Sequence, residues 1–181
     1  MHTLVNKLVG FPMKPRVIIV GTGHHLQAGS KKHSIEKREK FRAYIDELCK
    51  SHRIKLVVEE MSEDVLPDYG VVDTIPKEVA KSRRDVKHEY INATEAELSG
   101  LSIDRRSLGN TKDSVNLTDA QFAVLVRLVG ELRECLWLTR VLALNIWPTL
   151  LVCGASHVSR IEHLFNSVGK LAFVACHDYE P

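Results

Sequence analysis

The sequence lacks the cysteine patterns and the charge excess that mark several common classes of protein. Neither a CxxC pair nor a cysteine–histidine cluster occurs, so neither a zinc finger nor a disulfide framework is predicted, and we expect a reducing, cytoplasmic environment. The 25 Lys and Arg residues almost balance the 23 Asp and Glu residues. A net charge of +2 is too small to predict binding of duplex nucleic acid. The four cysteines are Cys49, Cys135, Cys153 and Cys176.

Long hydrophobic runs are also missing. No stretch reaches the roughly 18 to 20 consecutive apolar residues that a membrane-spanning helix needs. The most apolar stretch, residues 122–144, is interrupted by charged side chains such as Arg127 and Arg140, and is predicted to be a buried or amphipathic helix. Residues 1–20 contain Lys14 and other polar breaks instead of the apolar core of a signal peptide. We therefore expect no membrane partner.

The remaining composition is typical of one globular domain. With 181 residues, of which 44% are hydrophobic, the chain is long enough to bury a core without disulfides or a structural metal. We expect a single α/β domain over residues 1–181, in which residues 1–15 form an N-terminal arm. The polar segment 102–117 is long for a connection without secondary structure, and is predicted to be either a solvated loop or a lid.

Short β-branched runs alternate with amphipathic segments along the chain. This alternation predicts a mainly parallel central sheet of about five strands with helices on both faces, a Rossmann-like three-layer arrangement. Ser34, Thr94 and Thr118 are suited to cap the starts of three of the helices. The predicted strands are 16–20, 54–58, 86–91, 149–153 and 171–176, and the predicted helices are 33–52, 74–84, 94–100, 118–145 and 156–168.

Polar residues, many of them histidines and carboxylates, follow each predicted strand. Open parallel sheets bind ligands beyond the carboxyl ends of their strands, so these residues are predicted to gather at one rim. The sequence therefore places the candidate site there. The residues that follow the strands are 21–27 (GTGHHLQ), Glu59 and Glu60, Asn92, 154–157 (GASH), and His177 and Asp178.

Two of the nine histidines, His24 and His157, each stand three residues after a glycine that ends an apolar strand. Together with Glu60 they are candidate ligands for a divalent ion such as Zn²⁺ or Mn²⁺. A second carboxylate can then act as a general base, so Glu59 and Glu60 are the candidate catalytic residues. Adjacent strand residues point to opposite faces, so only one of the pair is expected to face the site, and the sequence leaves open which one.

Other residues of the rim are candidates for binding a substrate. The turn at 21–27 lacks the third glycine of GxGxxG and is not followed by GK[ST], so dinucleotide and P-loop sites are weak alternatives. The segment around Ser156 is not GxSxG, which disfavours a serine hydrolase. Arginines are suited to meet an anionic group of the substrate. The candidate substrate-binding residues are Gly21, Gly23, His25, Gln27, Arg84, Arg105, Arg106, Gly154 and Ser156.

The segments Gly21-Thr-Gly-His24 and Gly154-Ala-Ser-His157 are two GxxH motifs that resemble those of the TraB/Tiki group, in the superfamily that contains erythromycin esterase-like and ChaN-like proteins. The chain also resembles small bacterial proteins with a GTxH-LQ start, an acidic pair in the second strand and a CGxxHV end. The resemblance implies an α/β fold with a metal-dependent hydrolytic site; Tiki members are metalloproteases, and ChaN-like members bind haem iron. In the resemblance to the TraB/Tiki group, His24 and His157 match the motif histidines, and Glu59 or Glu60 matches the acidic position.

Three functions remain open. The first is a cytoplasmic metal-dependent hydrolase that acts on a small molecule or a peptide. The second is a non-catalytic module that binds an anion, a nucleotide or haem at the same rim. The third is an interaction protein in which exposed apolar residues of the long helix, around Trp137 and Trp147, form a homodimer face.

Overall fold

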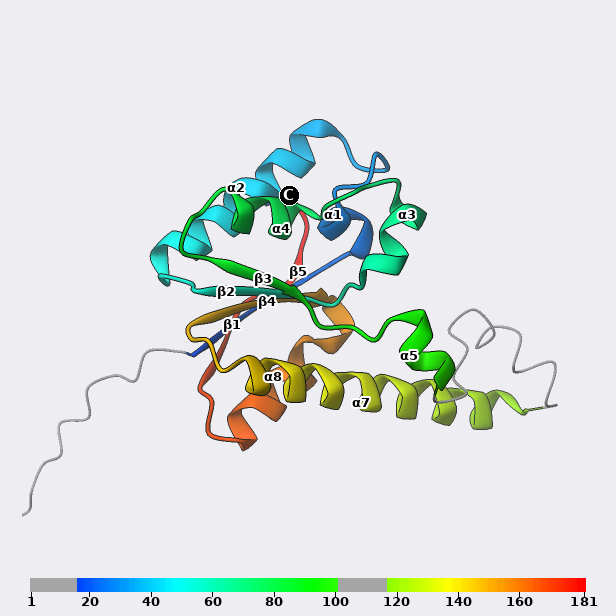
Figure 1. The fold of residues 1–181 in the computed structure, drawn as a ribbon. Helices are drawn as coiled ribbons and strands as arrows, with labels where there is room; N and C mark the ends of the chain where they lie inside the picture. Colours follow the sequence, from blue (N-terminus) through cyan, green and yellow to red (C-terminus); the bar gives the residue numbers. More distant parts are fainter. Residues whose placement is uncertain (1–15, 101–116) are drawn as a thin grey trace, which may run out of the picture.

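A five-stranded sheet lies at the centre of the molecule (Figure 1). The computed structural model describes residues 16–100 and 117–181, and within them every pair of neighbouring strands is parallel. The strand order is β3-β2-β4-β1-β5, and because all the strands are parallel their carboxyl ends lie at one rim. The α/β prediction is confirmed. The strands are β1 (Val17–Thr22), β2 (Leu56–Glu59), β3 (Lys87–Tyr90), β4 (Thr149–Gly154) and β5 (Ala172–Tyr179).

Helices cover both faces of the sheet, as Figure 1 shows. The first face carries α1 (His24–Ala28), α2 (Ile35–Ser51), α3 (Leu66–Tyr69) and α4 (Ile75–Lys81). The second face carries the long helix α7 (Asp119–Leu144) together with α8 (Val158–Ser167), and α5 (Glu95–Gly100) lies on the same side as α7. Two short 3-10 turns, η1 (Glu63–Val65) and η2 (Ala155–His157), lead into α3 and α8.

The alternation of strand side chains builds one core on each face. In β1, Ile18 packs with the α2 side chain of Phe41 in the first core. Its neighbour Ile19 points the other way and packs with Trp137 of α7 and Phe165 of α8 in the second core. All five of these side chains have no exposed surface. Because both faces are covered, the three central strands carry unbroken apolar runs, at 17–20 in β1, 56–58 in β2 and 150–153 in β4. The edge strand β3, with the sequence KHEY, does not.

Capping residues begin the helices where the sequence predicted them. The Ser34 hydroxyl accepts a hydrogen bond from the backbone N–H of Lys37 at the start of α2. Thr118 and Gln121 form a reciprocal capping box at the start of α7. These side chains satisfy backbone N–H groups that have no partner inside the helix, which fixes where each helix starts.

The structure also differs from several expectations. The turn predicted after β1 contains the helix α1, and the helix predicted at 156–168 begins only at Val158, after the turn η2. Of the two tryptophans of the predicted dimer face, Trp137 is completely buried and takes no part in any such face, and Trp147 is half-buried. The predicted arm at 1–15, and all of the predicted lid except Leu117, lie outside the described residues. In the described parts of the chain, no helix combines the length and apolarity needed to cross a membrane.

Candidate functional site

A pocket of about 450 Å³ opens at the carboxyl ends of the strands. Parallel strands bring together residues that are far apart in the sequence: His24 follows β1, Glu60 follows β2, and Asn92 follows β3. The helix α7 adds Arg133 from the second face. The pocket is lined by His24, His25, Glu60, Met61, Val65, Asp68, Tyr69, Asn92 and Arg133.

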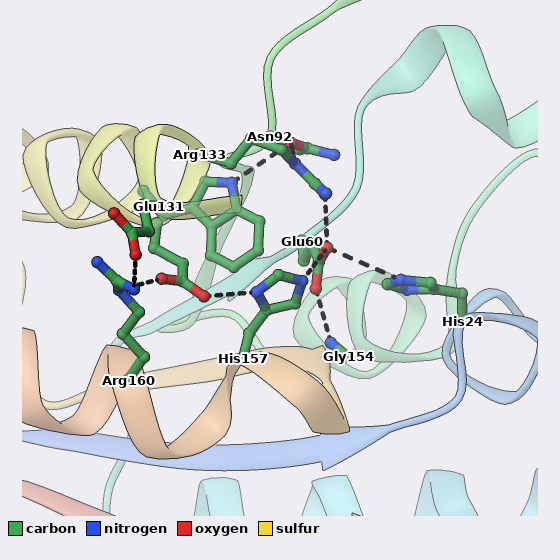
Figure 2. A network of polar contacts seen from close by, with 10 residues as sticks. His24, Glu60, Asn92, Glu131, Arg133, Gly154, His157 and Arg160 are labelled. Carbon is green, nitrogen blue, oxygen red and sulfur yellow. Dashed lines mark hydrogen bonds and ion pairs between the residues drawn. The ribbon is translucent and has the colours of Figure 1, made fainter. Parts of the chain in front are cut away.

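Glu60 is the carboxylate at the centre of this site (Figure 2). Its side chain is only 1% exposed. Arg133 donates from Nη2 to Oε1 over 2.6 Å, and the backbone N–H of Gly154 donates to Oε2 over 2.7 Å. The Nε2 atoms of His24 and His157 lie 3.7 and 3.5 Å from Oε1. A buried carboxylate needs such compensation, because the loss of hydration is otherwise costly.

A chain of ionic contacts orients His157 from behind. Nδ1 of His157 lies 2.6 Å from Oε1 of Glu134, and a carboxylate can only accept, so Nδ1 carries the proton. Oε2 of Glu134 lies 2.8 Å from Nε of Arg160, which also binds Glu131 over 2.6 Å. Figure 2 shows this chain running from the surface of α7 and α8 to Glu60. In the neutral imidazole, Nε2 therefore presents a lone pair toward Glu60.

His24 faces the same carboxylate from α1. Its side chain is 40% exposed, so it is the accessible member of the group, whereas that of His157 is 16% exposed. Among the described residues, the buried Nδ1 of His24 has no hydrogen-bond partner. Gly154 makes room for it: a Cβ atom there would lie 3.2 Å from Oε2 of Glu60 and 3.4 Å from Nε2 of His24. The glycine of the second GxxH motif therefore permits the approach of these two side chains.

Glu59 lies on the opposite face of the sheet and does not line the pocket. It is completely buried, and Gln27 donates to its Oε2 over 2.9 Å. Nε2 of His88 lies 2.7 Å from its Oε1, which also accepts from the Thr74 hydroxyl. The alternation of strand side chains thus separates the acidic pair, with Glu60 at the pocket and Glu59 inside the first face. Gln27, which binds Glu59, likewise does not line the pocket.

The structure distributes the other predicted substrate-binding residues more widely. Gly21 lies inside β1, where a Cβ atom would come within 1.9 Å of the carbonyl oxygen of His177, so packing accounts for it. Gly23 caps α1, and Ser156 is exposed in η2. Arg84 is exposed and precedes β3, at the amino ends of the strands and away from the pocket. The remaining two, Arg105 and Arg106, lie outside the described residues.

His25 lines the pocket beside His24. Its pKa is lowered from the usual value by burial first, and then by the positive neighbour Lys32 and by the nearby His33 and His24. Nζ of Lys32 lies 2.9 Å from Nε2 of His25, so the ammonium group donates to a neutral ring. The ring also meets Tyr69 edge to face, with centroids 5.1 Å apart. His25 therefore presents a neutral imidazole to the pocket.

Sequence reasoning missed the contribution of α7. Arg133 binds Glu60, and its Nε donates to Oδ1 of Asn92 over 3.3 Å. Trp137 donates to the same oxygen over 3.3 Å, so Asn92 positions the arginine. The sequence did contain a signal of this contribution. Glu134 lies three residues before Trp137 and seven before Val141, and therefore on the buried side of the helix. A buried acidic position in an apolar helix points to a charged partner.

The donors suit a divalent ion by type but do not form a finished metal site. Two imidazole nitrogens and one carboxylate oxygen are the ligands that Zn²⁺ and Mn²⁺ accept. Over residues 16–100 and 117–181, however, no group of three or more His, Cys, Asp or Glu side chains has the spacing of a metal centre. Arg133 bonds to the oxygen that faces both histidines. Ion binding therefore requires this guanidinium to move away.

Comparison of the chain with protein-family models, with curated proteins and with solved structures found no match. The likeness to the TraB/Tiki group therefore stays a prediction that depends on the two GxxH motifs. What supports a function is the pocket itself, which His24 and Glu60 line, together with His157, whose Nε2 lies 3.5 Å from Oε1 of Glu60.

Proposed function

We propose that this protein is a metal-dependent hydrolase whose divalent ion is held by His24, Glu60 and His157. The observation that carries the proposal is the orientation of His157. Nδ1 of His157 faces Glu134 over 2.6 Å, so in the neutral tautomer a lone pair on Nε2 points at Oε1 of the Glu60 carboxylate, 3.5 Å away. Two electron-rich atoms that face each other in a buried site repel, and a cation between them reverses the sign of that interaction.

The distances are consistent with this arrangement. Ligands about 2.1 Å from a tetrahedral ion lie roughly 3.4 Å from one another. The imidazole nitrogens of His24 and His157 lie 3.7 and 3.5 Å from Oε1 of Glu60, which is too far for a hydrogen bond and near the separation of two ligands. Small movements of the Glu60 carboxylate and of the Arg133 side chain are therefore sufficient for the carboxylate to bind an ion.

Each side chain has a distinct part in the proposed site. Glu134 holds His157 in the tautomer that leaves Nε2 free, as carboxylates commonly do for metal-binding histidines. A bound divalent ion would supply Lewis acidity to a carbonyl or phosphoryl group of the substrate. Arg133, once it leaves Glu60, is suited to bind an anionic group of that substrate. Glu59 has no access to the pocket, and we assign it no part in the reaction.

The second candidate function is a non-catalytic module that binds a small anion. The contact that favours it is the ion pair between Arg133 and Glu60, which occupies the oxygen that an ion would need. In this alternative Arg133 stays in place, and its guanidinium with His24 and His25 would recognise a carboxylate or a phosphate. The two candidates therefore assign opposite roles to Arg133.

Isothermal titration calorimetry with Zn²⁺, Mn²⁺ and inorganic phosphate tests the proposal on protein without a histidine tag. We expect one divalent ion per chain, with binding weakened more than about 10-fold in His24→Ala and in His157→Ala. Arg133→Met should bind the ion more tightly, because it removes a competing cation. The exposed His163 provides the control, and His163→Ala should bind as the parent does.

Two results would contradict the proposal. One is the absence of any metal binding by the parent chain, and the other is metal binding that is unchanged in both histidine variants. Phosphate binding that is lost in Arg133→Met, without metal binding, would instead support the anion module. If the ion binds as expected, hydrolysis of a panel of esters, phosphoesters and peptides, with and without a chelator, identifies the bond that is cleaved.

A further inference from the structure

The two halves of α7 have different surroundings. Every buried side chain of this helix lies in its C-terminal half, at Glu134, Trp137 and Val141. Residues 119–132 bury none, although most of them are apolar. Figure 1 shows this half running out beyond the sheet, while α8 lies beside the other half. Within the part of the chain that the structure describes, the N-terminal half of α7 is therefore an apolar helix that packs into no core.

Val124, Leu128 and Leu132 form a row along this half of the helix. Their exposed fractions are 50, 46 and 63%. The spacing of four residues puts them on one side of the helix, and at 100° per residue Leu128 and Leu132 lie roughly 140 to 180° around it from Trp137 and Val141. This row, which we call the α7 row, thus points away from the domain. Contiguous exposed apolar side chains of this kind mark interaction surfaces.

The charges beside the α7 row indicate what covers it. Arg127 and Glu131 are the only charged residues between positions 120 and 132, and both lie along the same edge of the row. The opposite edge carries Leu125 and Val129. Within one chain, Oε1 of Glu131 lies 3.6 Å from Nε of Arg127 and accepts from Arg160 over 2.6 Å. When two identical helices pack antiparallel, like edges meet. Arg127 and Glu131 would then lie beside the partner's Glu131 and Arg127 in one network of opposite charges, and the two apolar edges would face each other. In a parallel pair, the charged edge would lie against leucine and valine.

We propose that the α7 row is the interface of an antiparallel homodimer centred on Leu128. There, Leu128 packs against the partner's Leu128, and Val124 packs against the partner's Leu132. A two-fold axis requires such self-complementary pairing, in which each contact occurs twice. The proposal is independent of the metal site. It replaces the face around the buried Trp137 with residues that are exposed.

Sedimentation equilibrium of the full chain tests the interface. We expect a dimer for the parent and a monomer for Leu128→Glu and for Leu132→Glu. Leu128→Glu places two carboxylates against each other at the centre of the interface, and Leu132→Glu places a carboxylate against Val124 at each end of it. Val72 is 87% exposed and lies outside α7, so Val72→Glu is the matched control and should remain dimeric. A monomeric parent, or a dimer that survives both α7 substitutions, would overturn the proposal. Circular dichroism establishes that the variants are folded.

A cross-link tests the orientation, using a cysteine that the chain already has. Cys135 is free and exposed, and Cys176→Ser removes the other cysteine that is not buried. Position 123 precedes Arg127 by four residues and Cys135 follows Glu131 by four, so both lie on the charged edge. In an antiparallel pair centred on Leu128, position 123 lies opposite the partner's position 133 and within one helical turn of the partner's Cys135. A short bis-maleimide should therefore join chains that carry Ala123→Cys and should leave chains with Cys135 alone unlinked. Cross-linking through Cys135 alone, or none with Ala123→Cys, would overturn the antiparallel arrangement.

Discussion

Glu59 and Glu60 are neighbours in the sequence with almost the same burial, yet they belong to two different environments. Glu59 is enclosed by Gln27, Thr74 and His88 on the first face of the sheet. Glu60 receives Arg133 and the Gly154 N–H on the other side and borders a pocket. Burial alone therefore does not identify a functional carboxylate. What distinguishes Glu60 is an accessible imidazole beside it and space for a ligand.

The largest effect should come from removing the enclosed carboxylate. Glu59→Leu leaves His88, Thr74 and the Gln27 amide without their common acceptor in a buried region, and we expect the free energy of unfolding to fall by about 3–5 kcal/mol. Denaturant titration measures this change, and the melting temperature should drop by roughly 10 °C. Glu63 is exposed, so Glu63→Leu is the control and should change stability by less than about 0.5 kcal/mol.

In Glu60→Gln, unlike in Glu59→Leu, we expect the main loss to be in metal affinity and not in stability. The amide oxygen can still accept hydrogen bonds, so we expect a smaller loss of stability than in Glu59→Leu, together with a loss of metal affinity of more than about 100-fold. Denaturant titration and calorimetry on both variants separate the two effects. If the two substitutions prove equal in stability and in metal affinity, the difference between the two environments has no functional meaning.

A smaller effect is expected at the residue that positions His157. Glu134→Ala should weaken metal binding by about 10 to 100-fold, because Nδ1 of His157 loses its acceptor. Glu134→Gln should recover part of that loss, since its amide oxygen can accept the same proton. Glu131→Ala is a matched control on the same helix: it removes the other partner of Arg160 but does not touch His157. Equal losses in Glu131→Ala and Glu134→Ala would contradict the positioning role.

The smallest effect concerns protons at His25. Its pKa is lowered by burial and by Lys32, so its NMR titration midpoint should lie below the usual 6.5, and Lys32→Gln should raise it. A histidine whose folded pKa is depressed adds stability that is fully present above its unfolded pKa and is lost as the pH falls through the folded value. The fall in stability below pH 6.5 should thus be shallower in His25→Gln. A midpoint above 6.5 would contradict the assignment.

Local signals in the sequence predicted much of the fold. The apolar period of α2 and the capping box of α7 depend on residues within one turn of each other, and both elements form as expected. The gathering of His24, Glu60 and His157 also followed, because parallel strands place their carboxyl ends at one rim whatever their order.

Contacts that depend on the rotation of α7 were not predicted. Arg133 reaches Glu60 from 73 positions along the chain, and Glu134 reaches His157 from 23. No local pattern encodes which turn of a long helix lies over the strand ends. The same reason explains why the pocket contains Arg133, which the sequence did not single out, and not Arg84, which it did.

The sequence by itself determined the α/β class, the rim that carries the site and the separation of the acidic pair, since strand period and strand direction are local properties. Only the tertiary structure decided that Glu60, and not Glu59, borders the pocket, because that choice depends on which helices pack on each face. It also decided that Trp137 is buried while Leu128 and Leu132 are exposed. All three belong to the same apolar helix, and only its position against the sheet distinguishes its two halves.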